Sequence, residues 1–315
     1  MVDLSTGINP NPYPLPRFSA GLFGRLPDPA AVLALTAAAA RCYGVTSAAR
    51  VVPAPGTQIL LPLVAGMVHR GRAAVLVPSY PGHARAAALA GHDVVAMHEI
   101  ADVADARLVI IGNPNNPDGR LIARGALMAL AERLEARGGL MVVDEAFMDV
   151  GPPGASLADL PRGNIVVLRS FGKFFGLAGL RLGFALAAPE IAARLSALLG
   201  PWAVSGPALA VGAKALADAT WIARARRRLA KAADRLDTML VAAGLEIVGG
   251  TSLFRLARTP KASALFDHLG RAGILTRTFA EHASWLRFGL PGDEHAWRRL
   301  EAALHSFAES GRASA

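Results

Sequence analysis

The sequence of 315 residues contains a single cysteine, Cys42, so an intrachain disulfide is impossible. No Cys-x-x-Cys pair or Cys/His cluster is present, and we therefore expect no metal site. Cys42 stands beside Tyr43 in an Ala-rich segment, where a small packed residue is the simplest interpretation. Long hydrophobic runs are also absent, because Gly, Pro or a charge interrupts each run before it could span a bilayer.

Targeting signals are missing as well. The opening MVDLSTGINPNPYPLP carries an acidic residue and four prolines, which matches neither a signal peptide nor a transit peptide. The chain is 53% hydrophobic and 18% charged, a composition typical of a globular protein with a sizeable core. We therefore expect a soluble cytoplasmic protein without a membrane partner.

The net charge of +9 raises the possibility of nucleic-acid binding. The densest basic run, residues 223–235, spaces its arginines among Ala and Leu at helical intervals and contains no aromatic platform. This pattern favours a solvated helix face over a nucleic-acid surface. No helix-turn-helix pattern is present, and an anionic substrate would account for part of the charge.

Apolar runs ending in turn residues alternate with helical patterns over the first two thirds of the chain. Strand-like runs fall at residues 73–80, 106–119, 139–147, 164–171 and 181–187. This alternation predicts an α/β domain with a mostly parallel sheet, which we place at residues 31–195. Helical patterns dominate after about residue 188, and strand signals return at 244–257 and 284–290. We expect residues 196–315 and a Pro-rich arm at 1–30 to form a smaller α+β domain.

Polar side chains follow several of these strands. Tyr80 follows the first, Asn113, Asn115 and Asn116 follow the second, Asp144 and Glu145 end the third, and Ser170 and Lys173 follow the fourth. Ligands of an open parallel sheet bind beyond the carboxyl ends of its strands. The sequence therefore predicts that one edge of the sheet collects an aromatic ring, an amide, a carboxylate and an amine.

Together these groups have the chemistry of a pyridoxal-phosphate site, although each alone is a weak signal. A desolvated lysine forms Schiff bases, a carboxylate holds a heteroaromatic nitrogen protonated, and an aromatic ring stacks on a flat cofactor. Gly56 and Thr57 at a helix start, with Ser170 and Arg181, can bind a phosphate dianion. Neither nucleotide fingerprint, GxGxxG or GxxxxGK[ST], is present.

The ordered motifs NPNNPDG, VVDEAF and SFGKFFGLAGLRLGF resemble those of the class-I/II aminotransferases, which are fold-type-I enzymes dependent on pyridoxal 5′-phosphate (PLP). The resemblance covers nearly the whole chain. It implies that Lys173 is the Schiff-base lysine and that Asp144 pairs with the pyridinium nitrogen. The other cofactor contacts that it implies are Gly56, Thr57, Gln58, Tyr80, Asn116, Ser170 and Arg181.

The same resemblance implies contacts to the substrate and to a second subunit. Arg287, in SWLRFGLPG, is similar to the arginine that binds a substrate carboxylate, and Asn9 is a further substrate contact. Tyr43, in CYGV, is similar to the tyrosine that reaches the phosphate of the neighbouring subunit, which would make the enzyme a homodimer. Two positions depart from the family pattern, since Gly172 replaces a Ser or Thr and Phe147 replaces a Tyr.

Within the family, the segments DLSTGINPNPYPLP, APGTQ and WLRFGLPGD resemble the threonine-phosphate decarboxylases of cobalamin biosynthesis. That subfamily carries a His-Gly-Gly segment upstream of DLS, and this sequence begins just before DLS. Either the start is truncated or the substrate phosphate is held otherwise, and Arg277 is then its candidate ligand. An aminotransferase acting on a substrate such as histidinol phosphate is the alternative enzyme, and a non-catalytic, DNA-associated relative is the alternative of another class.

Overall fold

A computed structural model describes residues 1–160 and 162–313. Contacts divide the chain into a larger unit, Tyr13–Asn116 with Leu121–Ala219, and a smaller unit, Met1–Pro12 with Pro117–Arg120 and Thr220–Ala315. No helix among the described residues is both long enough and apolar enough to cross a membrane.

The two units differ in three places from the domains expected from the sequence. Residues 13–30 and 196–219 join the larger unit, because Tyr13 N donates to Phe175 O over 2.9 Å and the segment from 206 to 217 packs on the helix that ends at Tyr43. Residues 117–120 join the smaller unit. There a Cβ on Gly119 would lie 2.0 Å from Gly250 O, so only glycine permits the approach of the two backbones.

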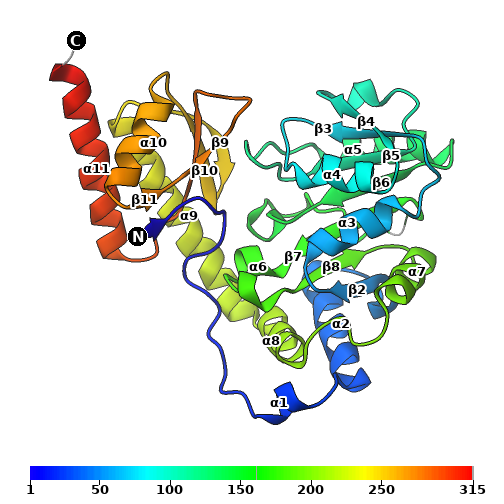
Figure 1. Ribbon diagram of the computed structural model, residues 1–315. Coiled ribbons are helices and arrows are strands. Elements are labelled where there is room, and N and C mark those ends of the chain that lie inside the picture. The colour runs from blue at the N-terminus through cyan, green and yellow to red at the C-terminus, as the bar shows by residue number, and fades with distance from the viewer. Residues whose placement is uncertain (161, 314–315) are drawn as a thin grey trace. The chain divides into compact units, whose positions relative to one another are not determined.

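The larger unit is built on a sheet of seven strands (Figure 1). Their order is β2 (Val51–Ala54), β8 (Gly183–Leu186), β7 (Ile165–Ser170), β6 (Leu140–Asp144), β5 (Leu108–Gly112), β3 (Arg72–Leu76) and β4 (Asp93–Met97). β8 runs antiparallel to both of its neighbours, β2 and β7, and the other described pairings in this sheet are parallel. This confirms the mostly parallel sheet expected from the alternation of strands and helices.

Helices cover the sheet of the larger unit. They are α1 (Gly21–Gly24), α2 (Pro29–Tyr43), α3 (Thr57–Ala65), α4 (Gly82–Leu89), α5 (Arg124–Glu135), α6 (Phe171–Phe174), α7 (Pro189–Leu199) and α8 (Gly206–Ala217). Four short 3-10 turns lie at Ala48–Arg50, Ile100–Val103, Met148–Val150 and Ala178–Leu180. Leu60 and Val64 of α3 pack with Leu195 of α7 against Val142 and Leu168 of the strands, which places these helices on one face.

The strand order reverses between β3 and β5. From β3 the chain adds β4 on one side, and β5, β6 and β7 then extend the sheet on the other side. In open α/β sheets, such a reversal leaves a crevice at the carboxyl ends of the strands where ligands bind.

The smaller unit contains an antiparallel sheet and three helices. The strand order is β12 (Arg277–Thr278), β13 (Trp285–Gly289), β10 (Phe254–Arg258) and β9 (Glu246–Thr251). A separate parallel pair joins β1 (Val2–Asp3) to β11 (Ile274–Leu275). The helices are α9 (Ala219–Ala242), α10 (Ala262–Arg271) and α11 (Glu294–Ala313).

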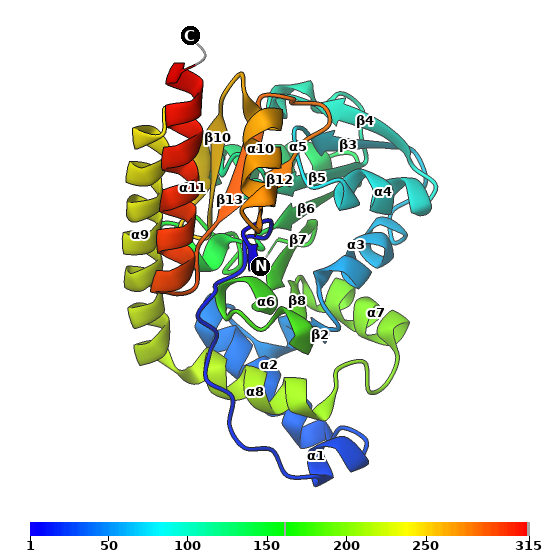
Figure 2. The same ribbon diagram turned by 60° about the vertical axis from the view of Figure 1, so that its left-hand side comes forward.

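Figure 2 shows α9 and α11 side by side, where Arg235 Nη1 lies 2.6 Å from Glu294 Oε1. The basic run 223–235 lies within α9, as its helical spacing predicted. Its apolar residues Leu229 and Ala233 are buried, and its arginines are exposed.

Candidate active site

Three predicted residues lie at or just beyond the carboxyl ends of β6 and β7, which are adjacent parallel strands of the larger sheet. Asp144 is the last residue of β6 and pairs in register with Gly112 of β5 and Leu168 of β7. Ser170 is the last residue of β7, and Lys173 follows within α6. The strand register therefore brings the carboxylate, the hydroxyl and the amine to the same edge of the sheet.

Asp144 is held by a residue that sequence reasoning missed. Oδ2 of Asp144 lies 2.8 Å from Nε2 of His83, and Oδ1 accepts a hydrogen bond from Ala146 N over 3.1 Å. An ionised carboxylate can only accept, so Nε2 of His83 carries the hydrogen in this pair. His83 is only 2% exposed and stands in the first turn of α4.

Tyr80 lies beside His83 at the start of the same helix, with the two ring centroids 5.6 Å apart in an edge-to-face arrangement. Its hydroxyl donates to Oε1 of Gln58 over 2.8 Å. The residue is 40% exposed, so ring surface remains accessible for stacking. Two of the predicted cofactor contacts, Tyr80 and Gln58, are thus hydrogen-bonded to each other.

Backbone groups and one guanidinium form a candidate phosphate site at the N-terminus of α3. Gly56 precedes the helix with φ +89°, and a Cβ there would lie 2.5 Å from Nη2 of Arg181. Arg181 is therefore in direct contact with the turn that presents Thr57 and Gln58. The N-terminus of a helix attracts anions through its free N–H groups and its dipole, and an adjacent guanidinium strengthens that attraction.

The asparagines after β5 have separate tasks. Asn113 is fully buried. Its Oδ1 accepts a hydrogen bond from Ile122 N over 2.8 Å and its Nδ2 donates to Ile122 O over 3.3 Å, so the two bonds hold together the ends of the loop between these residues. Asn115 donates through Nδ2 to Pro78 O over 2.8 Å. Asn116 is half-buried in the loop that these bonds hold, which suits the ring-hydroxyl contact predicted for it.

The structure explains one of the two departures from the family pattern. A Cβ at Gly172 would lie 2.8 Å from Cα of Ala178, so a Ser or Thr there would force the backbone apart. At the second departure, the Phe147 ring centroid lies 5.9 Å from Nζ of Lys173. Phe147 is 5% exposed, so an apolar wall stands beside the amine.

Tyr43 is enclosed within the larger unit. Its hydroxyl is buried inside the larger unit without a hydrogen-bond partner among the described residues. The ring packs against Phe184 at 5.8 Å, and the Arg169 guanidinium lies 4.3 Å from the ring centroid. Burial, followed by the charge of Asp149, raises the pKa of Tyr43 well above its ordinary value. The contact of Tyr43 with the phosphate of a second subunit stays a prediction, since the structure holds a single chain.

The predicted substrate residues lie in the smaller unit. Arg277 and Arg287 are directly opposite each other in the pairing of β12 with β13. Arg287 is 8% exposed, and its Nη2 donates to Ser5 O over 2.7 Å. Burial, and then the positive charge of Arg277, lower the pKa of Arg287 to about 10. Two like charges at directly opposed positions repel each other, so this arrangement favours the binding of an anion.

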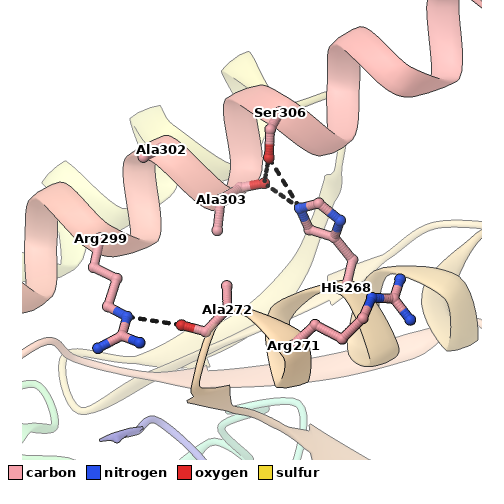
Figure 3. Close-up of a pocket in the computed structure, with 7 residues that line it drawn as sticks. All are labelled: His268, Arg271, Ala272, Arg299, Ala302, Ala303 and Ser306. Atoms are coloured by element: carbon pink, nitrogen blue, oxygen red, sulfur yellow. Dashed lines mark hydrogen bonds between the residues drawn. The ribbon is translucent and has the colours of Figure 1, made fainter.

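Asn9 is 1% exposed in the arm of the smaller unit, where its Oδ1 accepts a hydrogen bond from Asn11 N over 2.9 Å. A pocket of about 380 Å³ lies elsewhere in this unit, between α10 and α11 (Figure 3). There Arg299 Nε donates to Ala272 O over 2.7 Å, and none of the predicted site residues lines the pocket. The described residues contain no group of three or more His, Cys, Asp or Glu that could hold a metal ion.

Comparison with known proteins gives the family. Residues 15–304 match the family model of the aminotransferases of class I and II. A threonine-phosphate decarboxylase of Pseudomonas aeruginosa is 45% identical, with 98% of this chain and 92% of that protein covered. A protein of the same name from Sinorhizobium sp is 44% identical, with 96% and 91% covered. The crystal structure of the histidinol-phosphate aminotransferase from Clostridium acetobutylicum superposes with a TM-score of 0.86 at 23% identity, covering 98% of this chain and 100% of that one. The chain therefore belongs to the aminotransferase class I and II family.

Proposed function

We propose that this chain is a PLP-dependent threonine-phosphate decarboxylase. It converts L-threonine O-3-phosphate to (R)-1-amino-2-propanol O-2-phosphate and CO₂, a cytoplasmic step of cobalamin biosynthesis. The observation that carries the proposal is the opposed pair Arg277 and Arg287, which suits a substrate with both a carboxylate and a phosphate. The two relatives at 44–45% identity carry the same name.

The larger unit has the groups that PLP requires. Gly56 leaves room for Arg181 at the N-terminus of α3, and Thr57, Gln58 and Ser170 complete the phosphate contacts. Asp144, oriented by His83, would keep the pyridinium nitrogen protonated. Asn116 would donate to the ring hydroxyl, Tyr80 would stack on the ring, and Lys173 would be the covalent attachment point. When bound, PLP supplies the electron sink that weakens the bonds at the substrate Cα.

We assign the binding of the substrate to three residues of the smaller unit. Arg287 binds the substrate carboxylate through a planar guanidinium whose orientation the bond to Ser5 O fixes. Arg277 binds the phosphate, and Asn9 adds a polar contact to the substrate. When the carboxylate leaves as CO₂, Nζ of Lys173 would deliver the proton that takes its place at Cα. The wall formed by Phe147 limits the access of water to that amine.

Substrate discrimination tests the division of labour between the two arginines. Arg277→Ala should impair turnover of threonine phosphate far more than turnover of threonine, because only the phosphate ester has the group that Arg277 binds. Arg287→Ala should impair both, since both substrates have the carboxylate. Removing the charged partner of a bound anion costs about 2–5 kcal/mol. Equal slowing of the two substrates by Arg277→Ala would contradict the assignment.

An aminotransferase acting on histidinol phosphate would use the same cofactor residues but cleave the Cα–H bond. The likeness to the histidinol-phosphate aminotransferase structure, at 23% identity, concerns the fold. Arg287 would bind a carboxylate in either reaction, because the 2-oxo acid of a transamination also has one. What favours decarboxylation is the name of the two relatives at 44–45% identity.

We further propose that the active protein is a homodimer to which Tyr43 contributes across the interface, and exposed apolar residues support the dimer independently. Leu15, Phe23, Leu26 and Leu33 are between 56% and 69% exposed in a short stretch of the larger unit. Apolar side chains gathered in this way are typical of an interaction surface. A second copy of the chain would bury them.

A further inference from the structure

The segment from residue 145 to residue 149 follows Asp144, and one guanidinium holds both of its ends. Arg169 Nη1 lies 2.8 Å from Glu145 Oε2, and Arg169 Nη2 lies 2.8 Å from Asp149 Oδ1. All three side chains are almost completely buried, at 5%, 0% and 2% exposure for Arg169, Glu145 and Asp149. The mechanism above uses none of them.

Both carboxylate oxygens of Glu145 accept further hydrogen bonds. Ser156 Oγ donates to Glu145 Oε2 over 2.6 Å, and Leu157 N donates to Glu145 Oε1 over 2.7 Å. Burial opposes the charge of Arg169, but Asp149 and Glu145 outweigh burial, so the pKa of Arg169 lies above its ordinary value. A buried cation that is ion-paired with two carboxylates stays charged and keeps a fixed geometry.

The segment held by Arg169 contacts the reacting groups on both sides. Glu145 directly follows Asp144, and Ala146 N donates to Asp144 Oδ1. Phe147, at the centre of the segment, is the wall beside Nζ of Lys173. Arg169 itself directly precedes Ser170, at the end of the strand that leads to Lys173.

We propose that Arg169 is a positioning residue for the cofactor site. By bridging Glu145 and Asp149 it fixes the segment that orients the Asp144 carboxylate and places Phe147 against the lysine. The inference rests on the proposed PLP-dependent function. A purely structural ion pair would lower the stability of the fold when broken but would leave the surroundings of the bound cofactor unchanged.

Arg169→Lys separates the two possibilities, because an ammonium group lacks the fork that reaches two carboxylates at once. We expect PLP to bind about tenfold more weakly or worse, the scale found when groups that orient metal ligands are removed. The pH midpoint of the visible absorption of the bound cofactor should also shift. Both quantities are measured by spectroscopic titration, without reference to turnover.

Two controls isolate the positioning effect. Arg162→Lys alters another arginine that bridges two carboxylates, Glu132 at 2.6 Å and Glu135 at 2.8 Å, but on the surface, and should change neither quantity. Val166→Ala creates a cavity in the buried part of β7, away from the bridge, and should lower stability while leaving the absorption midpoint in place.

If Arg169→Lys matched Val166→Ala in both PLP affinity and absorption midpoint, the positioning role would be overturned. Should Arg169→Lys fail to fold, Asp149→Asn replaces it, since the amide keeps an acceptor but loses the charge. We expect a smaller change in the same quantities, and wild-type values would again overturn the role. Failure of the wild type to bind PLP at Lys173 would instead overturn the proposed function.

Discussion

Replacing Arg287 with methionine should strongly lower activity without destabilising the protein. Arg287 is a buried cation opposite a second cation, and its lowered pKa expresses the free-energy cost of keeping it charged. A fall from 12.5 to about 10 corresponds to about 3 kcal/mol at 1.36 kcal/mol per pKa unit. The methionine side chain avoids that cost and still packs on Phe254, whose ring centroid lies 5.2 Å from the guanidinium carbon.

The loss of one hydrogen bond offsets part of this gain in the free energy of unfolding. Arg287→Met removes the hydrogen bond from Nη2 to Ser5 O, and a hydrogen bond to a charged group contributes about 1.5–3 kcal/mol. The removed cost of the buried charge and the lost hydrogen bond partly cancel. The free energy of unfolding of Arg287→Met should therefore equal that of the wild type or exceed it by up to about 2 kcal/mol, as for other replacements of buried charges by apolar residues. Activity should fall by about 30- to 5,000-fold, the equivalent of 2–5 kcal/mol of lost anion binding.

The assay is urea unfolding of the apo protein, with and without phosphate, for the wild type and for Arg287→Met. Phosphate should stabilise the wild type more than the variant, because the variant lacks one of the two opposed cations. Arg255→Met is the matched control in the same sheet. Arg255 Nε already lies 2.7 Å from Asp237 Oδ1, so this change leaves a carboxylate without its partner and should destabilise. A loss of more than about 1 kcal/mol in Arg287→Met would refute the reasoning.

Three further outcomes are expected. Borohydride reduction of the PLP-loaded protein should fix the pyridoxyl label on Lys173, and Lys173→Ala should lose it; a label on Lys214 or Lys231 would exclude the assignment. Asp144→Asn should keep the fold and the hydrogen bond with His83 but lose most activity, since an amide cannot stabilise the pyridinium charge. Near-normal turnover of this variant would exclude the role of Asp144. Leu33→Asp should shift sedimentation from dimer to monomer because it buries a charge in the proposed interface, and a fully active wild-type monomer would contradict the dimer.

The sequence predicts the features of this fold that local pattern controls. Apolar runs followed by polar residues predicted that Asp144, Ser170 and Lys173 lie at or just after the ends of strands. The parallel register of β6 and β7 brings these strand ends together. The opposed positions of Arg277 and Arg287 could also be anticipated, because the two strand-like segments are close in sequence and joined by a loop.

Pairings between distant segments could not be predicted in this way. His83 and Asp144 are 61 residues apart, and their hydrogen bond depends on how α4 is placed beside the reversal in strand order. The one available signal was the spacing of three residues between Tyr80 and His83, which puts both on one side of the helix start. Tyr43 was assigned by motif alone, and motifs do not reveal that Arg169 and Phe184 enclose its ring.

The inclusion of residues 117–120 in the smaller unit likewise depends on tertiary contact. Gly119 and Gly250 are far apart in sequence, and each could equally mark an ordinary turn. Only the structure shows that their backbones approach too closely for any side chain.

The central claim is that the chain releases CO₂ from a phosphorylated amino acid, and product stoichiometry tests it most directly. The PLP-loaded wild type is incubated with L-threonine O-3-phosphate without any 2-oxo acid, and CO₂ and aminopropanol phosphate are quantified. We expect equal amounts of both products. Absence of CO₂, together with 2-oxoglutarate-dependent transamination of histidinol phosphate, would contradict it.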